Sequence, residues 1–200
     1  MTACSVTGVI CHMEIQHGKE GMKSAQFNDI MGATSGCTLR LLLNTIPQEQ
    51  QIVTSYGIQG DAWFGSVKTA NEVALRGHEG VFQIKQYHSL FPKDFIEEVL
   101  KEAPGGVHIV LKATTRDEVN LVAVGYCYSR KTILHFVLTE NAGSTSEGDP
   151  YEMKYTNSYG NICTRFVDRP EVISIFLLHP TLLIPIINYA KICWNWRRNG

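Results

Sequence analysis

Residues 60–76 read GDAWFGSVKTANEVALR, and this stretch decides how the rest of the chain folds. It is typical of a strand end followed by a tight aromatic turn and an amphipathic helix. Trp63 and Phe64 are bulky enough to anchor the turn, and Gly65 lets the backbone bend. Ser66 is a good helix N-cap, because its hydroxyl can accept a hydrogen bond from the first helical turn. We therefore expect a strand–turn–helix unit here.

Asp61 stands where the expected strand ends, and an acid in this position has two readings. In the first, its carboxylate accepts hydrogen bonds from backbone amides of the turn, as aspartates often do. In the second, it is a ligand for a divalent cation, because ligands bind at the carboxyl ends of strands in α/β sheets. The residues of the turn alone leave both readings open.

Short segments on both sides of this unit occur in a characteristic order. They are residues 7–10 with Glu14, 61–66, 82–85, 87–93, 103–106, 142–145 and 169–171. In this order the segments resemble piggyBac-like transposases and the domains derived from them, over about residues 4–175. The pattern D-x-W-F-x-S, which begins at Asp61, is the most specific part of the resemblance.

The resemblance implies a fold, a metal site and a partner. The fold is α/β, a ribonuclease H-like mixed sheet flanked by helices, with a β-rich insertion. It divides the chain into a first core part (residues 1–105), the insertion (106–167) and a degenerate final helix with an apolar tail (168–200). The family holds Mg²⁺ with three aspartates, cuts and joins DNA, and acts in the nucleus. Asp61 is the residue that matches one of these aspartates.

The match to the first aspartate is missing. In the family it lies on a strand just upstream of the segment that matches residues 7–10, and here Cys4 or Ser5 takes its place. Neither side chain is a good ligand for a hard Mg²⁺ ion. Either this ligand is lost or it lies upstream of Met1. The first acid in the chain is Glu14, in an expected strand at 6–15.

The last metal ligand is missing as well. The expected final helix begins near residues 169–171, and no acid follows Glu171. Glu14, Asp29 or Asp168 could replace a lost ligand only if the fold brought one of them beside Asp61. We therefore expect a transposase-derived chain that holds no cofactor and has no transposase activity.

Charge and cysteine content narrow the other possibilities. The formal net charge is −1, whereas DNA-binding proteins usually present a basic surplus, and this counts against autonomous DNA binding. The 6 cysteines have no zinc-site spacing and indicate reduced thiols in an intracellular protein. The beginning of the chain does not resemble a secretory signal.

Further elements follow from periodicity. Strands are expected at 81–86, 108–113, 120–128 and 132–138, and a hairpin at 151–156 and 162–167 that turns at 159–161. A helix over 92–101 places Phe95, Ile96, Val99 and Leu100 on one face. His88 is expected to be structural rather than catalytic.

The apolar tail suggests a competing function. Residues 172–194 are long enough to span a bilayer. An interfacial belt and a positive flank would be formed by Trp194 and Trp196 with Lys191, Arg197 and Arg198. Pro180 and Pro185 would break such a helix, so a buried, degenerate helix is the alternative. A third possibility is an interaction module that keeps the scaffold and binds DNA or a protein without chemistry.

Overall fold

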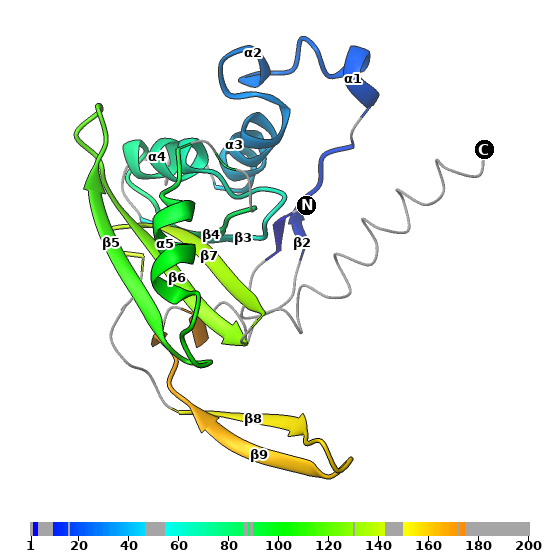
Figure 1. Ribbon diagram of the computed structural model, residues 1–200. Coiled ribbons are helices and arrows are strands. Elements are labelled where there is room, and N and C mark those ends of the chain that lie inside the picture. The colour runs from blue at the N-terminus through cyan, green and yellow to red at the C-terminus, as the bar shows by residue number, and fades with distance from the viewer. Residues whose placement is uncertain are drawn as a thin grey trace.

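A mixed five-stranded sheet flanked by helices forms the centre of the protein, an α/β fold (Figure 1). The computed structural model describes residues 2–3, 10–15, 17–46, 55–85, 88, 90–129, 131–142, 150–171 and 173–174. The strands are β1 Thr2–Ala3, β2 Ile10–His12, β3 Gly57–Gly60, β4 Glu79–Gln83, β5 His108–Thr114, β6 Asn120–Ser129, β7 Thr132–Thr139, β8 Tyr151–Thr156 and β9 Ile162–Val167. The helices are α1 Gly18–Gly21, α2 Asn28–Met31, α3 Ala33–Thr45, α4 Val67–Leu75 and α5 Lys93–Leu100.

The order of the strands across the main sheet is β3-β4-β7-β6-β5. Strands β3 and β4 are parallel and are connected by α4, because parallel neighbours need a crossover segment. The other neighbours pair antiparallel, and β5, β6 and β7 follow one another as a meander. Two smaller sheets, β1–β2 and β8–β9, have two strands each.

Side chains alternate between the two faces of the sheet, and each face has its own core. On one face, Phe82 of β4 and Leu121 of β6 pack with residues of α3, α4 and α5. On the other face, Val81, Val124 and their neighbours pack with Ile173. Because both faces are covered, the central strands are apolar on both sides instead of alternating.

The turn between β3 and α4 lies against β4. A Cβ at Gly65 would overlap the carbonyl oxygen of Gln83, so the backbones approach each other here as only glycine permits. The ring of Phe82 is fully buried and lies where a side chain at Gly60 or Gly80 would be. These contacts fix the turn on the sheet.

Most of the expected elements are confirmed, with two differences in their surfaces. In α5, Ile96 and Leu100 are buried as expected, but Phe95 is 52% exposed and Val99 is 51% exposed. Helical spacing identified the apolar residues but not the width of the stripe that the sheet covers. Trp63 is also largely exposed and stacks edge-on against Phe64, so it anchors the turn less than predicted.

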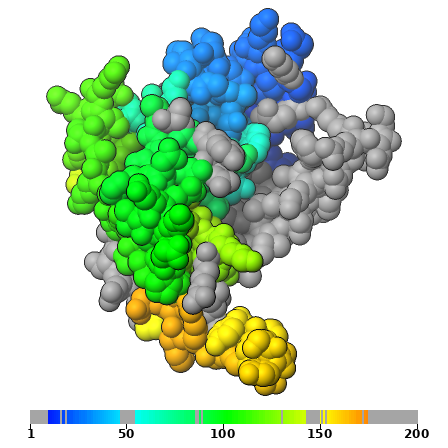
Figure 2. Space-filling view, viewed as in Figure 1, coloured from blue at the N-terminus to red at the C-terminus, as the bar shows by residue number. Residues whose placement is uncertain are grey.

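The segment 106–167 supplies strands to two separate places. Strands β5, β6 and β7 complete the same sheet as β3 and β4, whereas β8 and β9 pair only with each other. Gly160 turns this hairpin with a φ of 80°, inside the predicted turn at 159–161. In Figure 1 the hairpin projects from the main sheet, and Figure 2 shows it as a protrusion.

The predicted membrane span at 172–194 lies outside the described residues, apart from 173 and 174. The amide N–H groups of these two described residues, Ile173 and Ser174, donate to the carbonyl of Pro170, as in a first helical turn. No helix within the described ranges is long and apolar enough to cross a membrane.

The contact at Gly65 generates a stability prediction. Gly65→Ala is expected to lower the free energy of unfolding by about 3 kcal/mol, because the methyl group pushes the turn off β4. Gly57→Ala is the matched control, since nothing lies within 4 Å of a Cβ there. Urea denaturation followed by circular dichroism measures both variants. Equal stability of the two would show that the approach at Gly65 is not constraining.

Candidate functional site

Asp61 directly follows β3, at the carboxyl end of the parallel pair β3–β4. Its Oδ1 accepts the backbone N–H of Trp63 at 2.9 Å. Its carbonyl oxygen accepts the N–H groups of Phe64 and Gly65 at 3.0 and 2.9 Å. Asp61 therefore organises the turn through its backbone and its carboxylate. It also lies at the carboxyl ends of the parallel strands, where α/β proteins place their ligand-binding residues.

The helix after the turn begins on a small group of buried hydroxyls. Ser66 is the N-cap of α4, as predicted, and its Oγ accepts the N–H of Thr69 at 2.9 Å. The Oγ atoms of Ser66 and Ser35 are 3.1 Å apart, and Thr69 Oγ1 donates to Ser35 Oγ at 2.8 Å. Ser35 lies in the first turn of α3, so these hydroxyls join the beginnings of two helices beside Asp61.

The other predicted site residues do not gather around Asp61. Glu14 follows β2, Asp29 lies in α2, and Asp168 follows β9. Within the described part of the chain, no group of three or more His, Cys, Asp and Glu side chains could hold a metal ion. Cys4 and Ser5, where the first ligand was expected, lie outside the described residues.

Glu14 forms a two-point ion pair instead. Its carboxylate accepts hydrogen bonds from Nε and Nη2 of Arg40, each at 2.7 Å. Arg40 is only 8% exposed, and its Nη1 also donates to Asn28 Oδ1 at 2.8 Å and to the carbonyl of Gln26. The hydrogen bond with Glu14 raises the pKa of Arg40. The carboxylate thus compensates a buried guanidinium.

Cys37 lies one helical turn before Arg40 and shares its surroundings. Burial, followed by the nearby charge of Glu14, raises the pKa of the Cys37 thiol to about 11. At neutral pH the thiol is therefore protonated, and a protonated thiol is a poor nucleophile and a poor metal ligand. The residues around Glu14 stabilise the helices rather than perform chemistry.

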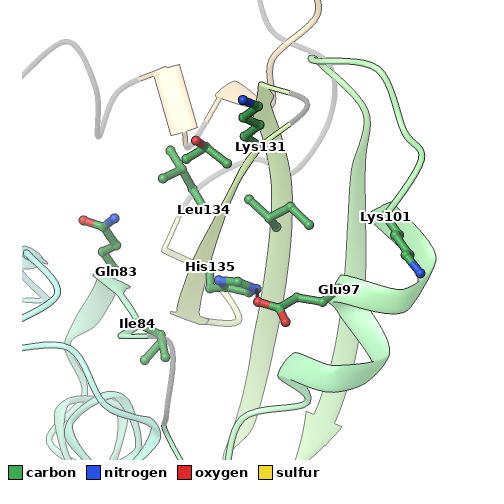
Figure 3. Close-up of a pocket in the computed structure, with 9 residues that line it drawn as sticks. Gln83, Ile84, Glu97, Lys101, Lys131, Leu134 and His135 are labelled. Atoms are coloured by element: carbon green, nitrogen blue, oxygen red, sulfur yellow. Dashed lines mark ion pairs between the residues drawn. The ribbon is translucent and has the colours of Figure 1, made fainter.

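A second polar site lies between α5 and β7. It is a hollow of about 460 Å³. Figure 3 shows His135, Glu97 and Gln83 among the residues that line it. His135 is 5% exposed, and within the described residues its Nε2 has no hydrogen-bond partner. Nε2 lies 3.9 Å from Glu97 Oε1, too far for a hydrogen bond. Periodicity did not identify His135, because it occupies a core position in a strand covered on both faces.

Burial, together with two nearby charges, sets the protonation state of His135. Burial lowers the pKa of His135, and nearby Lys93 lowers it further, while Glu97 acts in the opposite direction. Lys93 also pairs with Glu97 at 3.4 Å. The imidazole is therefore neutral at pH 7, with one nitrogen facing the hollow.

Comparisons of the chain with protein-family models, curated proteins and solved structures found no match. The resemblance to piggyBac-like transposases consequently rests on the segments of the sequence that carry it. The structure itself shows a mixed α/β sheet with Asp61 directly after strand β3.

The ion pair of Arg40 generates a prediction with a matched control. Arg40→Met removes two charge-assisted hydrogen bonds from the largely buried carboxylate of Glu14, so unfolding should become easier by about 3 kcal/mol. Arg76→Met removes an i,i+4 pair with Glu72 in which both side chains are about a quarter exposed, which should cost less than about 1 kcal/mol. Urea denaturation compares the two variants. A similar loss in both would contradict the structural role of Arg40.

The buried histidines predict acid sensitivity. Burial lowers the pKa of His78, His88 and His135 below the unfolded-state value. The unfolded chain therefore binds more protons than the folded one below about pH 6.5. Stability is complete above that pH and is lost as the pH falls toward the folded-state values, by at most about 1.4 kcal/mol per pH unit for each histidine.

The measurement is urea denaturation at several pH values between 7 and 5. His135→Gln should make the loss of stability on acidification smaller than in the unsubstituted chain, because one titrating group is removed. His17→Gln is the control, since His17 is exposed. An unchanged pH dependence in His135→Gln would contradict the prediction.

Proposed function

We propose that the chain is a piggyBac-like transposable element-derived domain whose ancestral DNA cleavage and strand transfer are lost. The observation that carries the proposal is the position of Asp61. It follows a strand of a mixed sheet, begins a tight turn and precedes an N-capped helix, within the pattern D-x-W-F-x-S. The order of the other segments along the chain supports the same family.

The proposed family also implies a ribonuclease H-like core and a β-rich insertion in this chain. The ribonuclease H-like core is assigned to residues 1–105, where the parallel pair β3–β4 carries Asp61 at its end. The β-rich insertion is assigned to residues 106–167, which hold the meander β5–β7 and the hairpin β8–β9. A nuclear location and DNA as the ancestral partner follow from the same resemblance.

Electrostatics explains why cleavage should be lost. Two-metal phosphodiester cleavage uses two divalent ions about 4 Å apart, clamped on the attacking and leaving oxygens. Several carboxylates are needed to hold that charge against a phosphate anion. In this chain Asp61 accepts a hydrogen bond from its own turn, and Glu14 is paired with Arg40. One carboxylate at the sheet edge is too little negative charge for two such ions.

A non-catalytic interaction module is the second candidate, and the hairpin β8–β9 favours it. Its exposed side chains include Tyr155, Tyr159, Ile162 and Phe166, of which Tyr159 is 86% exposed. An isolated two-stranded hairpin is only marginally stable in water, so apolar side chains on one are better explained by contact with a partner. Salt-dependent retention on DNA cellulose would indicate DNA; a lack of retention would leave a protein partner.

A nicking assay tests the proposed loss of activity. The purified chain is incubated with supercoiled plasmid and Mg²⁺ or Mn²⁺, and the variant Asp61→Ala is treated in the same way. Asp94→Ala is the control, because it also replaces an acid with alanine but lies in the exposed first turn of α5. We expect no nicked plasmid above the buffer background with any of the three. Nicking by the unsubstituted chain and by Asp94→Ala, but not by Asp61→Ala, would show an active metal site and overturn the proposal.

A further inference from the structure

Strand β5 forms one edge of the main sheet and has a ladder partner on one side only within the described residues. It is 7 residues long, contains no proline, and its register with β6 runs from His108 to Thr114 without a bulge. The opposite edge, β3, is 4 residues long and contains Gly57 and Gly60. A long, regular edge strand is a template for pairing with another strand, and β5 is the stronger template of the two.

The backbone groups that β5 offers can be identified from its ladder with β6. Cys127 N–H donates to the carbonyl of Val107 at one end, and Thr115 N–H donates to the carbonyl of Val119 at the other, both at 2.8 Å. In an antiparallel ladder, bonded and non-bonded residue pairs alternate. The odd-numbered residues from 107 to 115 therefore bond to β6. The N–H and C=O groups of residues 108, 110, 112 and 114 point to the free side.

We propose that two copies of this chain pair through β5, antiparallel, about a two-fold axis at Leu111. In this register His108 faces Thr114 of the second copy, and Val110 faces Lys112 of the second copy. All the outward-pointing residues are then in bonded pairs, which gives about eight backbone hydrogen bonds across the joint. The result is one continuous sheet across both copies, with a self-complementary interface as two-fold symmetry requires.

Charge and length favour this register over its neighbours. An axis at Lys112 would place two lysines directly opposite each other, and like charges in that position are destabilising. An axis at Val110 would leave Thr114 beyond the end of the partner strand. The axis at Leu111 sets each Lys112 against a valine and leaves its ammonium 3.9 Å from Glu140 of its own copy.

In the proposed pair, the α5 helices of the two copies lie on the same face of the continuous sheet, and each carries exposed apolar side chains. Helix α5 lies over β6, because a Cβ at Gly125 would meet Ile96 and Leu100 of α5, besides Ile109 of β5. Glu97 leans toward His135 on β7, so Phe95 and Val99 occupy the opposite flank of the helix, toward β5. Edge pairing places the two α5 helices about 14 Å apart, and the exposed Phe95 side chains of both copies can fill this gap. The exposure of Phe95 and Val99 thus has an explanation in the pair.

A cross-linking experiment tests the pair and its register together. Leu111→Cys places the two new thiols in a non-bonded pair with Cα atoms about 4.5 Å apart, within the range of a disulfide. Ala113→Cys is the matched control, because the symmetry-related positions are about 14 Å apart along the strands. Mild oxidation followed by non-reducing electrophoresis should give a cross-linked dimer with Leu111→Cys, and no more dimer with Ala113→Cys than with the unsubstituted chain. Equal cross-linking of both variants would refute the register.

Light scattering after size-exclusion chromatography gives the second readout. The unsubstituted chain should elute as a dimer, and Val110→Pro should weaken the dimer about tenfold or more because an outward N–H is lost from each copy. Val110→Thr keeps that N–H and serves as the control. A monomer at all concentrations would refute the pair. If the dimer remains intact in Val110→Pro and does not cross-link in Leu111→Cys, the interface lies elsewhere and the proposed pair is refuted.

Discussion

The parallel pairing of β3 with β4 is the constraint on which the rest of the structure depends. Parallel neighbours cannot be joined by a tight turn, so the chain has to cross the sheet as α4 before it returns. This crossing places Asp61 at the carboxyl edge of the sheet and presses Gly65 against Gln83. It also leaves β4 free to pair with β7 on its other side, which attaches the whole meander β5–β7. The position of Asp61 and the order of strands around β4 therefore both follow from the parallel pairing of β3 with β4.

Two buried polar side chains, Arg40 and His135, are stabilised in different ways. Arg40 is satisfied by Glu14, Asn28 and a backbone carbonyl, so its charge is compensated at the cost of fixing several side chains. His135 avoids that cost by staying neutral in its hollow. The first arrangement is rigid and the second responds to acid, and neither creates the cluster of carboxylates that a two-metal centre needs.

Local signals in the sequence predicted local structure well. The N-cap Ser66, the helix after it and the hairpin turn at Gly160 follow from side-chain chemistry within a few residues, and all were predicted. Contacts between distant residues were not. Nothing near Glu14 in the sequence indicates Arg40, 26 positions later, so the sequence does not predict their ion pair. The order of strands in the sheet is likewise a long-range property that periodicity does not contain.

Which apolar side chains stay exposed is also decided by long-range packing, so the sequence pattern does not predict it. Helical spacing grouped Phe95 with Ile96 and Leu100, although the sheet covers only the last two. The hairpin β8–β9 is a related case, because its strands pair only with each other among the described strands, and Arg165 donates to the carbonyl of Gly105. Because side chains near its tip such as Tyr159 are exposed, substitutions there should change the stability of the main sheet little. Exposed aromatic side chains add little to folding, so selection that keeps Tyr159 and Phe166 would act on something other than stability.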